Sequence, residues 1–158
     1  MMQHHYHTQL CWTGNRGAGT LDYRAYSRDH EMTGEHKTIV IPGTSDPAFR
    51  GDPQRYNPEE LLIHSLSACH MLWYLHLCAE HGVVVLAYKD APSGSMQENP
   101  QGHGGRFTAV TLRPQVQVAH PDMVPIAQAL HQAAHLHCFI ANSCNFPIHH
   151  QPLVYLEE

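Results

Sequence analysis

The chain has 158 residues, with 9 Lys and Arg against 14 Asp and Glu, which gives a formal net charge of -5 when histidine is neutral. This length predicts one domain over residues 1–158 that buries about 68–70% of the surface of its unfolded chain, so folding needs no disulfide framework. An acidic balance without a Lys/Arg cluster excludes nucleic acid as an expected partner, and no apolar run approaches the roughly 18 residues that cross a membrane. Residues 1–10 lack the basic start and the apolar stretch of a secretory signal, so we expect a cytoplasmic protein.

The first third of the chain is predicted to be β structure. Two loosely alternating segments, residues 5–12 and 20–27, flank a glycine-rich turn and predict a β-hairpin. The β-branched run 37–41 predicts a further strand, which Pro42 and Gly43 end.

A strong helix signal follows. Asn57 is the expected N-cap, Pro58 takes the first helical position, and Glu60 completes a capping box. Gly82 is expected to end the helix. Apolar side chains cover nearly every face of the segment, so we expect a buried helix at the centre of the fold.

The second half is predicted to contain three strand segments, a flexible connection and a second helix. In chain order these are strand 83–88, connection 92–105, strand 107–118 interrupted by Pro114, a helix from Asp122 to about Ala141, and strand 148–156. The buried stripe of the second helix is predicted to consist of Ile126, Leu130, Ala134 and Cys138. This order predicts an α+β fold with helices packed on antiparallel sheet.

The five cysteines are scattered and form no CxxC pair, which fits neither a secreted disulfide framework nor a zinc ribbon. They are Cys11, Cys69, Cys78, Cys138 and Cys144. We expect Cys11, Cys78 and Cys144 to fill space in the packed protein, as unpaired thiols commonly do.

The helix entry NPEELL at residues 57–62, with Cys69 ten residues after Glu59 and Cys138 on the second helix, resembles the organic hydroperoxide resistance/osmotically inducible protein (Ohr/OsmC) family. The glycines of the opening segment, from Trp12 to Thr20, agree with it more weakly. The resemblance implies an OsmC-like fold, in which antiparallel sheets pack around a long buried central helix and a second helix. It also implies an intertwined homodimer with sites at the interface.

By the same resemblance, the protein is a thiol-dependent peroxidase that reduces organic hydroperoxides. Cys69 would be the peroxidatic residue and Cys138 the resolving residue, joined after the reaction in a Cys69–Cys138 disulfide. The chemistry suits these residue types, because a thiolate attacks the peroxide bond and the resulting sulfenic acid condenses with a second thiol. No metal or organic cofactor is implied. An external dithiol, lipoyl or thioredoxin-like, would restore the thiols.

Neither thiol lies at the amino end of a predicted helix, so a positive side chain is needed to stabilise the Cys69 thiolate. The resemblance points to Arg50 on the loop before the first helix, with Arg16 and Arg55 as rivals. Glu59 corresponds to the acidic partner of that arginine. Ten residues of helix span about 15 Å, so Glu59 can serve the Cys69 site only through a bridging Arg50 or from a second subunit.

Two other functions remain open. His131, His135 and Cys138 are spaced i, i+4, i+7, which places two imidazoles and a thiol on one helical face as in a zinc or copper site. The 16 histidines of the chain make such a triplet easy to obtain by chance. The third interpretation is a noncatalytic OsmC-like protein that binds a hydrophobic ligand between its subunits.

Overall fold

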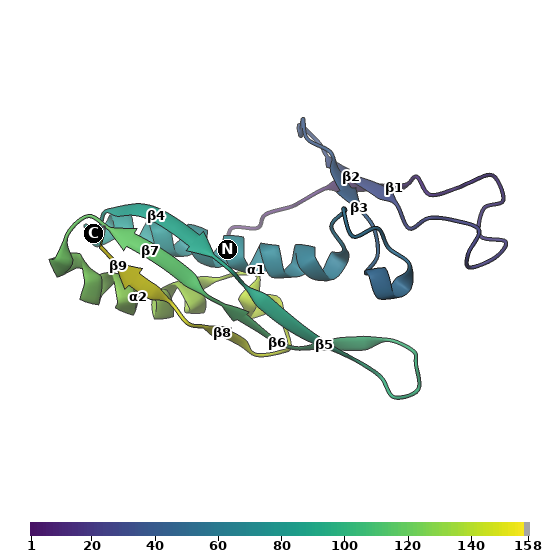
Figure 1. The fold of residues 1–158 in the computed structure, drawn as a ribbon. Helices are drawn as coiled ribbons and strands as arrows, with labels where there is room; N and C mark the ends of the chain where they lie inside the picture. Colours follow the sequence, from purple (N-terminus) through teal and green to yellow (C-terminus); the bar gives the residue numbers. More distant parts are fainter. Residues whose placement is uncertain (157–158) are drawn as a thin grey trace. The chain divides into compact units, whose positions relative to one another are not determined.

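The computed structural model describes residues 1–156 and divides into two compact units, Met1–Leu62 and the chain from Ile63 onward (Figure 1). Each unit is described by itself. The boundary falls inside the first long helix, α1 (Pro58–Glu80). The single domain expected from the chain length stays a prediction.

The N-terminal unit is built on a three-stranded antiparallel sheet in the order β1-β2-β3. The strands are β1 (Thr8–Trp12), β2 (His30–Gly34) and β3 (Ile41–Gly43). The predicted hairpin is therefore wrong in its second strand, because β1 pairs with β2 rather than with residues 20–27. The strand predicted at 37–41 begins only at Ile41 and contains Pro42, which the sheet tolerates because β3 is an edge strand.

The segment 20–27 forms a loop that is organised by an arginine and aromatic rings. The Arg28 guanidinium donates to the carbonyl oxygens of Tyr26 at 2.7 Å and Tyr23 at 2.8 Å. It also lies 4.2 Å from the centroid of each of these two rings. Trp12 Nε1 donates to the Ser27 carbonyl oxygen at 2.9 Å, which ties the loop to β1. The alternating side chains that predicted a strand at residues 20–27 take part in this local packing instead.

The start and end of α1 are confirmed. The Glu60 backbone N–H donates to Asn57 Oδ1 at 2.8 Å, and the Asn57 N–H donates to Glu60 Oε2 at 3.1 Å, which is the predicted capping box. The helix ends at Glu80, and Gly82 follows with a φ of 70°. The buried side chains of α1 share one face and are Leu66, His70, Tyr74, Leu77 and Cys78. The helix is buried on this face and not on nearly every face as predicted, since Leu72 is 62% exposed.

By length and composition α1 could cross a membrane, contrary to the expectation from the sequence. This is weak support for a membrane segment, because a helix packed in a protein core has the same features. Leu66, Tyr74 and Leu77 of this helix are buried in the protein.

The C-terminal unit contains two three-stranded sheets and the second helix. Its elements are β4 (Val85–Asp90), β5 (Ser93–Glu98), β6 (Gly105–Leu112), β7 (Pro114–Val118), α2 (Val124–His137), β8 (Ile148–His150) and β9 (Leu153–Tyr155). The sheet orders are β4-β7-β9 and β5-β6-β8. The α+β class is confirmed. The sheets are mixed rather than antiparallel throughout, because β6 pairs with β8 and β7 with β9 in parallel.

Three predictions for this unit need correction. Residues 93–98 of the expected flexible connection form β5, which pairs along β6 although all its residues are exposed. The long strand predicted at 107–118 is divided at Arg113 into β6 and β7, which belong to different sheets. The strand predicted at 148–156 is likewise two strands, β8 and β9, because Gln151 and Pro152 separate them.

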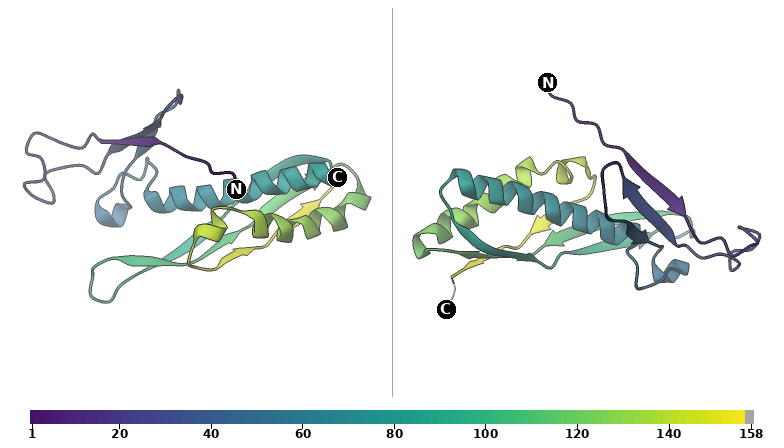
Figure 2. Two further views of the ribbon diagram at one scale, coloured as in Figure 1. Left: turned by 180° about the vertical axis from the view of Figure 1, so that it is seen from behind. Right: turned by 90° about the horizontal axis from the view of Figure 1, so that it is seen from above.

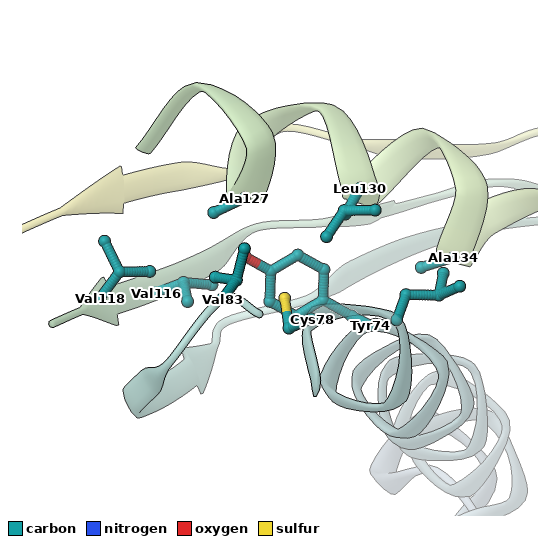
Figure 3. Close-up of a cluster of buried hydrophobic side chains, with 9 residues drawn as sticks. Tyr74, Cys78, Val83, Val116, Val118, Ala127, Leu130 and Ala134 are labelled. Atoms are coloured by element: carbon teal, nitrogen blue, oxygen red, sulfur yellow. The ribbon is translucent and has the colours of Figure 1, made fainter. Parts of the chain in front are cut away.

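The core of this unit lies where α1, α2 and β7 meet (Figure 3). Both helices lie along the same side of the strands (Figure 2). The Tyr74 ring projects from α1 into the middle of the cluster. The cluster consists of Tyr74, Leu77, Cys78, Val83, Val116, Val118, Ala127, Leu130 and Ala134.

The second helix differs from its prediction in extent and in its buried face. It is preceded by a short 3-10 helix, Pro121–Met123, and ends at His137 with Cys138 as its C-cap. Its buried residues are Ala127, Leu130, His131 and Ala134. Ile126, predicted for the buried stripe, is 48% exposed, and His131 is fully buried instead.

Candidate functional site

Cys69 and Cys138 meet in the C-terminal unit. Cys69 lies two turns into the part of α1 that belongs to this unit, and Cys138 caps α2. Both are free thiols, and they lie close enough for Cys69 to raise the pKa of the Cys138 thiol. Cys69 is half-buried, whereas Cys138 is 1% exposed. The fold therefore brings together two thiols that are far apart in the sequence.

The environment of Cys138 makes it a poor first nucleophile. Burial, reinforced by the neighbouring Cys69 thiol, raises the pKa of the Cys138 thiol to about 12. The Ala141 N–H donates to its sulfur at 3.4 Å and opposes this shift only in part. Cys138 is thus protonated at neutral pH, so it is not the thiol that reacts first with an oxidant.

Cys69 opens onto an apolar pocket of about 400 Å³. The lining residues are Cys69, Leu72, Trp73, His76 and Phe139. The Trp73 ring is held by three rings, with centroid distances of 5.1 Å to His137, 5.6 Å to Phe139 and 5.8 Å to His76. No carboxylate or lysine lines the described pocket, so it favours an uncharged, apolar group next to the thiol.

A pair of buried histidines, one on α1 and one on α2, was not predicted from the sequence. His70 Nε2 and His131 Nδ1 are 3.0 Å apart, and both side chains are at most 1% exposed. Burial, with smaller repulsion from His150 and His135, lowers the pKa of His70 to about 4. Burial and His70 lower the pKa of His131 to about 3. Both rings are therefore neutral at physiological pH. The sequence carried one signal for the pair, which is helical spacing. His70 lies four residues before Tyr74, on the buried face of α1.

The three-ligand metal site considered from the sequence does not form in this conformation. His131 Nδ1 is engaged by His70, the His135 ring lies 5.3 Å from that of His150, and Cys138 contacts Cys69. Within residues 1–156, no group of three or more His, Cys, Asp or Glu side chains is arranged to hold a metal ion.

Arg50 and Glu59 lie in the N-terminal unit. Arg50 follows the short 3-10 helix Pro47–Phe49 and is exposed, with a left-handed φ of 68°. A Cβ on Gly51 would collide with the Ser45 carbonyl oxygen, so this turn depends on glycine. The left-handed conformation of Arg50 is that of the C-cap of this 3-10 helix, and its backbone N–H donates to the Pro47 carbonyl oxygen at 3.0 Å.

The structure does not bring Arg50 and Glu59 into an ion pair within the described residues. Glu59 Oε2 is buried and has no hydrogen-bond partner among residues 1–156. Of the rival arginines, Arg55 is shared between Asp29 and Asp52, at 3.9 Å from each, whereas Arg16 is exposed. A buried carboxylate oxygen without a partner is costly, which makes Glu59 a candidate to receive a cation.

The other cysteines are separate from this pair. Cys78 is buried in the core, as expected, and Cys144 is half-buried. The packing role expected for Cys11 is wrong, since this thiol is exposed on β1.

Comparison with known proteins assigns the family. Residues 51–151 match the family of OsmC-like proteins. The chain belongs to this family. The matched segment contains Glu59, Cys69 and Cys138 and begins one residue after Arg50. The OsmC-like fold predicted from the sequence is confirmed, whereas no curated protein matches the chain.

Solved structures of OsmC-like proteins resemble this chain over nearly its full length. An OsmC-like protein of unknown function from Vibrio cholerae is 26% identical, with a TM-score of 0.85 over 96% of this chain and 100% of that one. An organic hydroperoxide resistance protein from Elizabethkingia anophelis is 16% identical, with a TM-score of 0.68 over 99% and 100%. One from Legionella pneumophila, also described as a predicted redox protein, is 14% identical, with a TM-score of 0.64 over 98% of both chains. This OsmC-like chain thus shares its fold with organic hydroperoxide resistance proteins.

Proposed function

We propose that this OsmC-like protein is a thiol-dependent peroxidase that reduces organic hydroperoxides. The Cys69 thiolate attacks one oxygen of the peroxide, the O–O bond breaks, and the alcohol leaves after taking up a proton. Cys69 is then a sulfenic acid. The Cys138 thiol attacks its sulfur, water leaves, and a Cys69–Cys138 disulfide forms. A dithiol reductant, lipoyl or thioredoxin-like, returns two electrons by thiol–disulfide exchange.

The observation that carries this proposal is the contact between the two thiols at the edge of an apolar pocket. The half-buried Cys69 is the thiol that lines the pocket, whereas the buried Cys138 has a strongly raised pKa. This difference between the two environments fits Cys69 as the first nucleophile and Cys138 as the resolving thiol. The aromatic and aliphatic lining around Trp73 suits the organic group of a hydroperoxide better than it suits hydrogen peroxide.

Arg50 and Glu59 complete the proposed site. The guanidinium of Arg50 would stabilise the Cys69 thiolate, and Glu59 would orient it through a charge-assisted pair. The buried Oε2 of Glu59, which has no hydrogen-bond partner among residues 1–156, supports its role as the partner of a cation. We expect Arg50→Lys to retain part of the oxidation rate of Cys69 and Arg50→Ala to lose more of it, measured by stopped-flow tryptophan fluorescence.

We propose that the protein is a homodimer. None of the hydrophobic side chains of residues 1–62 is buried, so the N-terminal unit has no hydrophobic core of its own. A groove of about 750 Å³ along β1, β2 and residues 36–41 is lined by exposed Leu10, Ile39 and Ile41. Apolar surface of this kind marks an interface. Light scattering should give twice the mass of one chain, and a monomer would contradict this part of the proposal.

The proposed location is the cytoplasm, where free thiols persist.

Thiol counting tests the peroxidase directly. One equivalent of cumene hydroperoxide should remove two of the five thiols per chain without forming a covalent dimer. Cys138→Ser should instead stop at a sulfenic acid on Cys69, which dimedone traps. Cys11→Ser is the matched control, because it removes an exposed thiol outside the pair, and it should still lose two thiols. If Cys69→Ser loses thiols as fast as the unmodified protein, the assignment fails.

A further inference from the structure

His131 is fixed to α1 by three contacts at once. Its Nδ1 hydrogen bonds with His70 Nε2 at 3.0 Å. Its ring lies parallel to that of His70, with 5.4 Å between centroids and 5° between planes, and stacks on Tyr74 at 3.9 Å and 11°. His70 and Tyr74 are four residues apart, on the same face of α1. One side chain of α2 is therefore anchored to two neighbouring side chains of α1.

This anchor lies on the helix that presents the second thiol. Cys138 caps α2 seven residues after His131, so about 10.5 Å of regular helix connects the two positions. On α1, His70 directly follows Cys69. A shift of His131 along or away from α1 would be carried by this short rigid segment to Cys138, and would change its distance from Cys69.

Within residues 1–156, neither ring of the pair forms an ion pair. His150 from β8 has its ring centroid 5.7 Å from that of His70, and His135 of α2 lies 5.3 Å from His150. Tyr74, which stacks on His131, is a further titratable neighbour, and its ring centroid lies 5.9 Å from that of Tyr88 of β4. His70 Nδ1 and His131 Nε2 are buried without hydrogen-bond partners among residues 1–156. The hydrogen bond between the rings is thus the specific polar link of this cluster.

We infer that His70 and His131 are positioning residues for disulfide formation, which hold the Cys138 end of α2 against Cys69. The inference rests on the proposed thiol chemistry, but it concerns only the second step. Oxidation of Cys69 by the peroxide needs no contact with α2. Attack by Cys138 on the oxidised sulfur requires the two atoms in line, and a misplacement of about 1 Å can slow such a step by about 100-fold.

The test separates the two steps with His131→Leu and His131→Asn. Leucine removes the hydrogen bond, whereas the asparagine amide puts a polar atom near the Nδ1 position and restores it. After one equivalent of cumene hydroperoxide in the presence of dimedone, mass spectrometry gives the ratio of trapped sulfenic acid to disulfide. We expect this ratio to rise at least about tenfold in His131→Leu and to stay within about twofold of the unmodified protein in His131→Asn. The control is His103→Leu, in the exposed β5–β6 turn, which should leave the ratio unchanged.

Diamide provides a readout that does not depend on the peroxidase. It oxidises dithiols directly, so slower closure of the Cys69–Cys138 disulfide in His131→Leu would support positioning even if peroxide left Cys69 unreacted. Near-UV circular dichroism checks that the variant is folded. Should the single variant unfold, the double variant His70→Leu/His131→Leu, which leaves neither ring unpaired, takes its place. A folded leucine variant that closes the disulfide at the unmodified rate overturns the inference.

Discussion

The buried histidine pair should make the protein unstable in mild acid. In the unfolded chain a histidine has a pKa of about 6.5, whereas the folded values are about 4 for His70 and about 3 for His131. A lowered folded pKa means that the unfolded chain binds more protons below pH 6.5. Stability from these rings is therefore complete above about pH 6.5 and is lost as the pH falls towards the folded values.

The size of the effect follows from the same values. Lowering the pH from 7 to 5 reduces the free energy of unfolding by about 2 kcal/mol for each ring, and therefore by about 4 kcal/mol for the pair. Domains of this kind commonly have about 5–15 kcal/mol in total, so the loss is large. Burial also lowers the pKa of His150, which adds to the loss in the same direction.

Urea denaturation followed by tryptophan fluorescence measures this loss. The midpoint should fall steeply from pH 7 to pH 5 in the unmodified protein. The double variant His70→Gln/His131→Asn keeps polar groups near the bonded ring nitrogens but cannot be protonated, so its midpoint should fall much less. His103→Gln, at an exposed position, controls for the general rise in positive charge. Equal losses in the unmodified protein and the double variant would refute the argument that burial keeps these rings neutral.

Three further results are expected. Gly51→Ala should lower the urea midpoint by an amount equivalent to about 1–3 kcal/mol, because the alanine Cβ would collide with the Ser45 carbonyl oxygen. An unchanged midpoint would show that the turn relaxes. Asn57→Ala should cost about 1 kcal/mol in the same assay through loss of the N-cap, and Asn57→Asp should not, so equal losses would argue against the cap. Iodoacetamide at pH 8 should alkylate Cys138 at least about 100-fold more slowly than Cys11, since Cys138 is buried with a raised pKa. Peptide mass spectrometry measures both rates, and similar values in the folded protein would contradict this environment.

The sequence by itself determined the limits of α1. Asn57 and Glu60 satisfy each other within one turn, and Gly82 adopts the positive φ that follows a helix end, so these signals need no distant partner. The resemblance carried by NPEELL and the two cysteines also gave the OsmC-like fold. Contact between Cys69 and Cys138 was expected from the family, and the structure has it.

Only the tertiary structure decided which strands pair and which helix faces are buried. Residues 20–27 alternate like a strand, yet β1 finds its partner in β2, and β5 forms from a segment whose composition predicts a loop. Strand pairing depends on non-local hydrogen bonds, which local alternation cannot specify. Likewise, the pairing of His70 with His131 cannot be read from the sequence, because only the packing of α1 and α2 buries both rings and brings His70 Nε2 within 3.0 Å of His131 Nδ1.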